Sequence, residues 1–357
     1  MKKLQACIVA GALASAVVAL APQAQCGVIT PINTASSGGY TFENFDGPTP
    51  NAAGTTINGI SNTGTVVGFT TADMVTFNNF TANPLLSNNA VSFQVGNSTA
   101  AMGNGINSNG SVVGLDGNGN AFSIIGGNVT TFIPGGGTSA VAFGINDNGV
   151  IVGQYTTTSG TMPGFVLDGK NLLTINAPSG PNTVNAQGIN NNGLVVGFYV
   201  GTDTQDHGFS VKVAMGATGA ITGVPIADPV IPPVPGEPGA KFVFSQILGI
   251  NDQGIAVGYY GDTTTSQHGF LYNTNTGKYT FLDNPDAMFT PAGVEVTQIT
   301  GINNQGEITG FYTDAAGVPH GFVAIVPEPA SWMLLSSSVL TVVGLARRRA
   351  RGATSAD

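Results

Sequence analysis

The chain has 357 residues, a formal net charge of −9 and only 8% charged residues. Its 52 glycines and 20 prolines favour short strands joined by tight turns over long amphipathic helices, which need more Glu, Lys, Arg and Leu. Residues 27–326 contain four Lys, no Arg and seventeen Asp or Glu, a net charge of −13 that excludes nucleic acid and anionic lipid as partners of this body.

The N-terminus has the order of a secretory signal peptide. Met1-Lys2-Lys3 precedes an apolar run, Ala6–Leu20, and small and polar residues follow up to Cys26. A cut after Cys26 places small residues at the recognition positions, and a cut after Ala24 is the alternative. Both cysteines of the chain lie in or beside this segment, so the body has no disulfide framework and no thiolate for metal or catalysis.

A ten-residue motif then occurs six times. In every copy a glycine is followed by Ile, and glycine recurs five and nine residues later. The third residue is Asn, except for Ser61 in the first copy. This pattern predicts a strand, a tight turn and a second strand, with glycine at a positive φ in the turn. The six copies begin at Gly59, Gly105, Gly144, Gly188, Gly249 and Gly301.

A third strand is predicted around a phenylalanine that follows each motif. It stands twenty-one residues after the first glycine in five copies and seventeen residues after it in the second copy. Apolar runs such as Asn128–Phe132 and Lys278–Leu282 predict a fourth strand. The phenylalanines are Phe80, Phe122, Phe165, Phe209, Phe270 and Phe322.

The repeat lengths fit four-stranded blades. Successive copies begin 46, 39, 44, 61 and 52 residues apart, which leaves two lengthened loops. The longer loop contains five prolines between Pro229 and Pro238 and is expected to project from the sheet.

The segment Tyr40–Phe45 resembles the fourth-strand segment Tyr279–Leu282, whereas the last copy has no fourth strand of its own. We therefore predict an all-β, six-repeat β-propeller over residues 40–325, in which the N-terminal strand closes the last blade. A β-solenoid or an open β-repeat array is the alternative, disfavoured by the length of the repeats.

At the C-terminus, Pro327-Glu328-Pro329 precedes an apolar stretch, Ser331–Ala346, and Arg347-Arg348-Arg349. The stretch is short for a membrane-spanning helix, which needs roughly 20 residues, and the arginines would stay on the cytoplasmic side. This order resembles the PEP-CTERM sorting signal of Gram-negative bacteria. The resemblance implies a transient inner-membrane stage, processing by an exosortase-type transpeptidase and transfer to the cell surface. A plain C-terminal anchor is the alternative.

The repeats also resemble the HAF family of extracellular repeats, which pair a Gly-Ile-Asn-x-x-Gly hairpin with a later His-Ala-Phe. Here the second element is His-Gly-Phe in the last three copies, beginning at His207, His268 and His320. The family implies an exported repeat domain and no agreed activity.

Candidate chemistry is sparse. The three histidines hold the same place in successive repeats, so each is expected to hydrogen-bond a turn of its own blade rather than join a metal site or serve as a catalytic base. The pairs Asp203/Asp206 and Asp283/Asp286 are expected in solvated turns.

Two further features are interpreted as structural. Asp116–Asn120 resembles the opening of a calcium loop, but Ala121 and Gly127 stand where such a loop has Gly and Glu, so a turn is expected. The only tryptophan, Trp332, lies in the tail. The aromatic pairs Phe198-Tyr199, Tyr259-Tyr260 and Phe311-Tyr312 are expected to pack the blades.

These features predict an exported, non-enzymatic cell-surface or extracellular-matrix protein without cofactor, sorted by an exosortase-type system and associated with exopolysaccharide. The alternative is a secreted polysaccharide hydrolase or lyase, which should bring polar residues unique to one or two blades together at one mouth of the ring. The expected organisation is a signal peptide (1–26), an N-terminal linker (27–39), the β domain (40–325), the PEP-CTERM tail (326–351) and a terminal segment (352–357).

Overall fold

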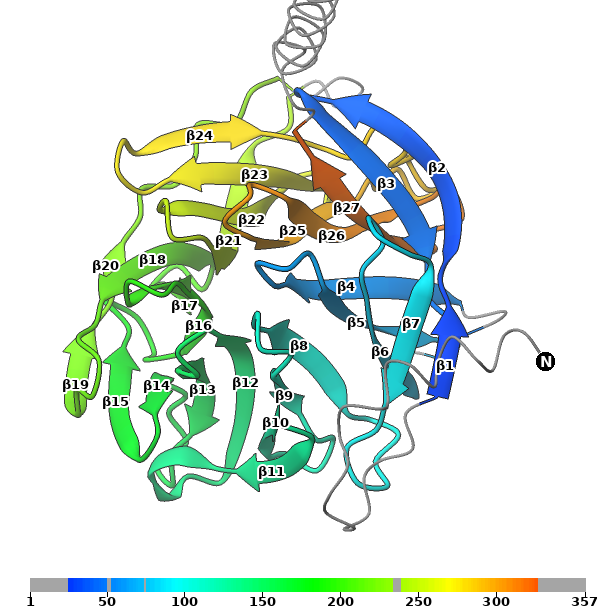
Figure 1. Ribbon diagram of the computed structural model, residues 1–357. Helices are drawn as coiled ribbons and strands as arrows, with labels where there is room; N and C mark the ends of the chain where they lie inside the picture. The colour runs from blue at the N-terminus through cyan, green and yellow to red at the C-terminus, as the bar shows by residue number, and fades with distance from the viewer. Residues whose placement is uncertain (1–24, 50–52, 74, 234–238, 327–357) are drawn as a thin grey trace, which may run out of the picture. The chain divides into compact units, whose positions relative to one another are not determined.

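The computed structural model describes residues 25–49, 53–73, 75–233 and 239–326, and these form a six-bladed β-propeller, as predicted (Figure 1). One compact unit ends at Ile325. Most of the predicted signal peptide and the motif, apolar stretch and arginines of the predicted sorting tail lie outside the described residues. Within the ranges described, no helix is long and apolar enough to cross a membrane; a single 3₁₀ turn, η1 (Pro134–Gly136), is present there.

Each blade begins at the central axis with the predicted hairpin. The innermost strands are β4 (Gly54–Ile60), β8 (Met102–Ile106), β12 (Ser139–Ile145), β16 (Val184–Ile189), β21 (Phe242–Ile250) and β25 (Thr297–Ile302). Their antiparallel partners are β5 (Val66–Thr71), β9 (Val112–Leu115), β13 (Ile151–Thr156), β17 (Leu194–Val200), β22 (Ile255–Asp262) and β26 (Ile308–Thr313).

Further strands extend each blade outward. The third strands are β6 (Phe77–Ala82), β10 (Ala121–Ile125), β14 (Gly164–Asp168), β18 (Asp206–Lys212), β23 (Gln267–Asn273) and β27 (Pro319–Ile325). The fourth are β7 (Asn89–Phe93), β11 (Asn128–Phe132), β15 (Asn171–Asn176), β20 (Val224–Pro225), β24 (Lys278–Phe281) and β3 (Tyr40–Asp46). Three blades carry a fifth strand, namely β1 (Gln25–Val28), β19 (Gly219–Thr222) and β2 (Thr30–Ser37).

The N-terminal strand closes the ring, as predicted. Strand β3 pairs antiparallel with β27, so that Thr41–Phe45 stand opposite Gly321–Ile325. Phe42 is fully buried against Phe322, with ring centroids 5.2 Å apart. Because β3 occupies the fourth-strand position of the sixth blade, the last repeat does not leave β27 as an open edge.

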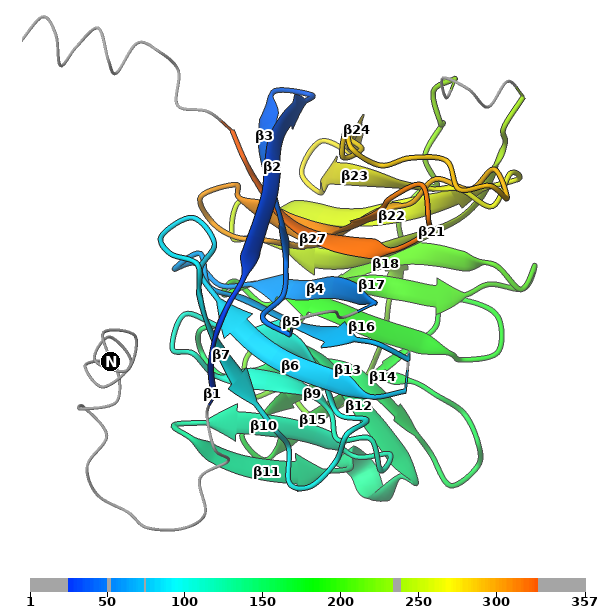
Figure 2. The same ribbon diagram turned by 90° about the vertical axis from the view of Figure 1, so that its right-hand side faces the viewer.

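The predicted linker over residues 27–39 is wrong, because most of it is strand. Strand β1 pairs with β7 of the first blade, whereas β2 pairs with β3 of the sixth blade. Ile29, between them, is 1% exposed and packs with Phe45 and Ile57. The segment thus runs across the seam between the first and last blades (Figure 2). Pro31 is tolerated because β2 is an edge strand with a bulge next to that residue.

The first glycine of each motif allows the innermost strands to approach one another closely. A methyl group on Gly105 would lie 3.0 Å from the Cα of Gly144, and one on Gly301 would lie 3.3 Å from the Cα of Gly59. A β-bulge precedes this glycine in every blade and leaves one residue without a ladder partner. The strands therefore meet backbone to backbone around the axis.

The other two motif glycines serve the hairpin and the core. The middle glycine has a φ of 74° to 80° in all six copies, as the turn requires. The last glycine stands directly opposite the repeat phenylalanine in the ladder, as Gly197 does opposite Phe209. A methyl group on Gly197 would collide with the main-chain oxygen of Asn185 and lie 2.9 Å from the Phe209 ring. All six phenylalanines are fully buried at these positions.

We expect Gly197→Ala to destabilise the propeller by about 1–3 kcal/mol, because the added methyl group must displace the first strand or the Phe209 ring. Urea unfolding followed by circular dichroism measures this loss. Thr131→Ala on the exposed face of β11 is the control and should change the free energy of unfolding by less than about 0.5 kcal/mol. Equal stability of the two variants would contradict the steric role of this glycine.

Candidate functional site

The central axis is interrupted by a ring of six isoleucines, the second residues of the motifs, each 6–8% exposed. They separate two small cavities. The cavity on the side of the motif turns has a volume of about 60 Å³, and we call it the turn mouth. The other, of about 80 Å³, is lined by the bulged residues, and we call it the bulge mouth. The isoleucines are Ile60, Ile106, Ile145, Ile189, Ile250 and Ile302.

At the turn mouth, the motif asparagine forms two kinds of hydrogen bond. Its Oδ1 accepts main-chain N–H groups of its own turn, as Asn190 does from Asn192 at 3.1 Å and Leu194 at 2.9 Å. Its Nδ2 donates to the main-chain oxygen of the equivalent residue in the next blade, at 2.9–3.1 Å. The five donor and acceptor pairs are Asn107 to Asn146, Asn146 to Asn190, Asn190 to Asn251, Asn251 to Asn303 and Asn303 to Ser61.

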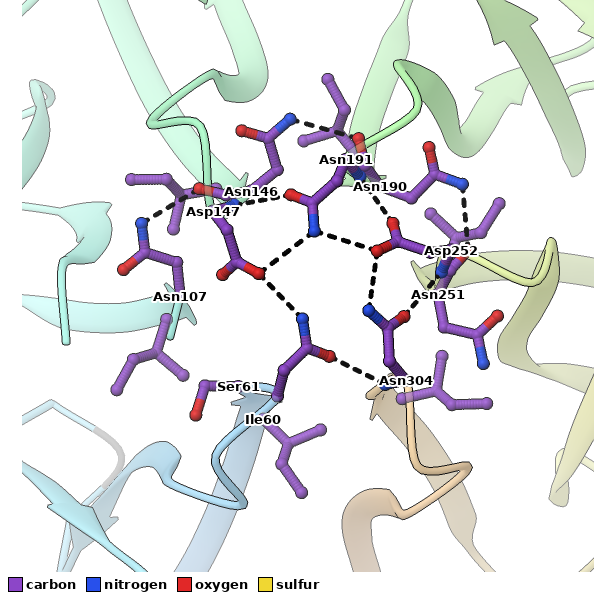
Figure 3. Close-up of a pocket in the computed structure, with 16 residues that line it drawn as sticks. Ile60, Ser61, Asn107, Asn146, Asp147, Asn190, Asn191, Asn251, Asp252 and Asn304 are labelled. Atoms are coloured by element: carbon purple, nitrogen blue, oxygen red, sulfur yellow. Dashed lines mark hydrogen bonds between the residues drawn. The ribbon is translucent and has the colours of Figure 1, made fainter. Parts of the chain in front are cut away.

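The residue after the asparagine forms a second ring (Figure 3). Its main-chain N–H donates to a side-chain oxygen of the equivalent residue in the next blade at 2.7–2.9 Å. The five pairs are Ser108 to Asp147, Asp147 to Asn191, Asn191 to Asp252, Asp252 to Asn304 and Asn304 to Asn62. The two rings therefore join five of the six pairs of neighbouring blades, all except the first and second.

Two carboxylates break the symmetry of this mouth. Asp147 and Asp252 come from the third and fifth blades, and both accept a hydrogen bond from Asn191 Nδ2, at 3.1 Å and 3.0 Å. Asp147 also accepts from Asn62 Nδ2 at 2.9 Å, and Asp252 accepts from Asn304 Nδ2 at 2.7 Å. Sequence reasoning missed this pair, although Asp follows the motif asparagine only in these two copies.

The carboxylates are engaged as acceptors within the protein. Partial burial raises the pKa of Asp147, but hydrogen bonds from Ser108, Asn191 and Asn62 outweigh it and lower the pKa overall. An ionised carboxylate held by N–H donors is a poor proton donor. The arrangement is therefore suited to joining blades, and catalysis by these groups would require the amide network to open.

Each of the three histidines lies between two aspartates of its own blade, where the sequence predicted only a hydrogen bond to a turn of that blade. Nδ1 faces an aspartate at the end of the fourth strand: Asp228 for His207 at 3.0 Å, Asp283 for His268 at 2.9 Å and Asp46 for His320 at 2.8 Å. Nε2 faces an aspartate at the loop between the second and third strands: Asp203 at 3.0 Å, Asp262 at 3.6 Å and Asp314 at 3.5 Å. We call each set an aspartate–histidine clamp.

Charge favours protonated histidine in two clamps. For His207, partial burial lowers the pKa, but Asp203 and Asp228 outweigh it and raise the pKa overall. For His320, the hydrogen bond to Asp46 is the main cause of a raised pKa, against partial burial. The hydrogen bond from His207 lowers the pKa of Asp203. The clamp at His320 also fastens β3, which carries Asp46, to the last blade.

The aspartate pairs singled out in the sequence need correction. Asp203 and Asp283 belong to the clamps rather than to purely solvated turns. Asp206 lies in β18, where its carboxylate accepts a hydrogen bond from Gln246 at 2.6 Å. Asp286 accepts from Asn44 at 2.6 Å and from Asn33, so it holds the N-terminal hairpin. Loop composition alone could not reveal Gln246 and Asn44, which lie far from Asp206 and Asp286 in the chain, whereas His207 follows Asp203 by only four residues.

The remaining sequence candidates are structural in their geometry. Asp116 Oδ1 accepts N–H groups from Asn118 at 2.7 Å and Asn120 at 3.0 Å, which forms the expected turn. Five of the six residues in the aromatic pairs are buried and pack the blades, namely Phe198, Tyr199, Tyr259, Tyr260 and Tyr312, whereas Phe311 is half-buried. Among the residues that the structure describes, no group of three or more His, Cys, Asp or Glu is placed to hold a metal ion.

No protein-family model and no curated protein matches the chain. Similar solved structures include the β-propeller domain of the Trilobed protease from Pyrococcus furiosus, with 8% identity over 83% of this chain and 95% of that chain and a TM-score of 0.42. An oligogalacturonate lyase in complex with manganese is 10% identical over 86% of this chain and 99% of that chain, with a TM-score of 0.47. An Aleuria aurantia lectin in complex with a fucoside is 12% identical over 77% of this chain and 96% of that chain, with a TM-score of 0.38. At these values the similarities carry no argument about function.

We expect Asn190→Ala to destabilise the fold by about 1–3 kcal/mol, because it removes two turn hydrogen bonds and one bond between blades. Asn190→Ser should lose less stability, since the Ser61 hydroxyl accepts the main-chain N–H groups of the equivalent turn in the first blade. Chemical unfolding of both variants measures the difference. If both variants unfold like the unmodified protein, the asparagine ring does not stabilise the ring of blades.

The clamps predict a stability maximum in mildly acidic solution. A histidine whose folded pKa is raised stabilises fully below its ordinary value of 6.5, and this contribution is lost as pH rises through the folded pKa. Asp203 has a lowered pKa, so it stabilises the folded state above its ordinary value of 3.8, and this contribution is lost as pH falls through the folded pKa. We expect the double variant His207→Gln, His320→Gln to have a lower melting temperature than the unmodified protein. The difference in melting temperature should be largest between about pH 4 and 6.5 and smaller at pH 9. A difference in melting temperature that does not change with pH would contradict a clamp based on charge.

Proposed function

We propose that this chain is an exported, non-enzymatic cell-surface or extracellular-matrix protein, sorted by an exosortase-type transpeptidase and associated with extracellular polysaccharide. The observation that carries the proposal is the position of the sorting motif relative to the fold. The compact unit ends at Ile325, and Pro327-Glu328-Pro329 begins two residues later. Cleavage at the motif would therefore leave every described strand in place.

The closure of the ring supports processing at this point. The last blade is completed by β3 from the N-terminus and needs no residue after Ile325. At the other end, a signal-peptide cut after Cys26 would shorten β1 to Gly27 and Val28 and leave β2 and β3 whole. Both proposed cuts thus fall at the margins of the folded body.

The use of polar groups supports a non-enzymatic role. The motif amides, Asp147 and Asp252 at the turn mouth form hydrogen bonds across blades. The clamp histidines line neither axial cavity. A body with acidic residues in excess is also suited to remaining soluble outside the cell.

One observation favours the alternative, a polysaccharide hydrolase or lyase. Asp147 and Asp252 are polar residues unique to two blades that meet at one mouth, the feature expected of an enzyme on this scaffold. Release of reducing ends or unsaturated products from the producing cell's polysaccharide tests this reading. Product formation that is lost in Asp147→Asn and Asp252→Asn would establish an enzyme and reject the non-enzymatic proposal.

Processing is tested by intact mass and terminal peptide mapping of the protein recovered from the surface of its native cells. We expect an N-terminus near Gly27 and a C-terminus close to Pro327–Pro329. The triple variant Pro327→Ala, Glu328→Gln, Pro329→Ala should retain Trp332–Arg351 and stay with the membrane fraction. Recovery of unmodified protein that still carries Trp332–Arg351 would reject exosortase sorting and favour a plain anchor.

A further inference from the structure

The bulge mouth is where the six repeats differ most at the axis. The bulged residue stands between a buried strand position and the constant Gly-Ile, so all six bulged residues line one cavity. Their side chains range from amide and hydroxyl to aromatic and aliphatic. They are Asn58, Asn104, Phe143, Gln187, Leu248 and Thr300.

Three blades use this position to join their neighbours. Asn58 Nδ2 donates to the main-chain oxygen of Gly103 at 2.9 Å, and Asn104 Nδ2 donates to that of Ala142 at 2.9 Å. Thr300 Oγ1 donates to the main-chain oxygen of Ile57 at 2.7 Å. In each case the acceptor lies two residues before the axial glycine of the next blade. The side chains on this half of the bulge mouth are therefore used in hydrogen bonds between blades.

The other three blades depart from this rule. Phe143 and Leu248 carry no donor, so neither can bind the next blade in this way. Between them, Gln187 forms no side-chain hydrogen bond to any residue that the structure describes. All three side chains are half-buried. Consecutive blades thus present an aromatic ring, an amide and an aliphatic group to one cavity.

The chemistry of this surface defines a ligand class. No charged side chain lines the cavity, and the excess of carboxylates in the body repels anionic polymers. An amide can donate to one hydroxyl group and accept from another, whereas the aromatic and aliphatic groups suit a C–H face. A neutral sugar ring offers both kinds of surface.

We propose that the bulge mouth binds a neutral sugar residue of an extracellular polysaccharide, with Gln187 hydrogen-bonded to its hydroxyl groups and Phe143 and Leu248 against its apolar face. The cavity of about 80 Å³ admits part of one ring, so the bound residue lies at a chain end or at an exposed branch. This inference rests on the proposed function and gives it a site.

Titration calorimetry of the protein as its native cells process it tests the site. The probes are neutral tetrasaccharides of glucose, galactose and mannose, with tetragalacturonate as the charged comparator. We expect binding of at least one neutral probe and none of tetragalacturonate. Phe143→Asn and Leu248→Asn should each weaken binding roughly tenfold or more. Both place Asn where the first two blades carry it, so they are compatible with the fold.

Matched variants separate the site from general effects. Leu86→Asn changes an exposed leucine in a loop outside the cavity and should leave affinity unchanged. Gln187→Glu keeps the shape of the side chain and should also weaken binding, which keeps the test decisive if an apolar variant folds poorly. Absence of binding to all neutral probes, or unchanged affinity in Phe143→Asn and Gln187→Glu, would overturn the inference.

The same experiment distinguishes failure of the site from failure of the proposed function. If the protein and its bulge-mouth variants bind the producing cell's polysaccharide equally well, the site is wrong and the surface role stands. If the unmodified protein binds neither this polysaccharide nor any probe, the association with polysaccharide fails as well. Sorting and display are then decided by the terminal peptides alone.

Discussion

The close approach of six strands at the axis is the constraint on which the rest of this propeller depends. Glycine at the first motif position lets neighbouring backbones touch, as at Gly105 and Gly144. At that separation an asparagine two residues later reaches the next blade's carbonyl oxygen. Each such bond contributes on the order of 1 kcal/mol, and the bonds share one ring. A larger residue at the first motif position would push the innermost strands apart and so break the hydrogen bonds that the asparagines form between blades.

The sequence predicts what the repeat dictates locally and misses what depends on distant partners. Blade number, hairpins, buried phenylalanines and closure by Tyr40–Phe45 follow from spacing and similarity. Strand β2 was missed because an exposed edge strand has no buried face to impose alternation. Asp147 and Asp252 come together only through the ring geometry, 105 positions apart in numbering. The aspartates of the clamps likewise come from separate loops of each blade.

The structure separates residues that the fold needs from residues that it leaves free to vary. The first motif glycine, the isoleucine after it and the buried phenylalanine occur in all six copies, because the glycines meet their counterparts at the axis and the apolar side chains are buried. The bulged residue faces a cavity and is held by no such symmetry. Variation there costs the fold little, since three blades omit the bond that the other three make. Function on a repeat scaffold is therefore best sought where the copies disagree.

The position of β27 has a mechanical consequence. The chain leaves the folded body at Ile325, the end of a strand paired on one side with β26 and on the other with β3. A force on the following residues pulls β27 along its length, so both ladders must slide together under shear. Pulling an edge strand outward would instead unzip one pair at a time. A force applied where the chain leaves the folded body is therefore resisted by two ladders at once.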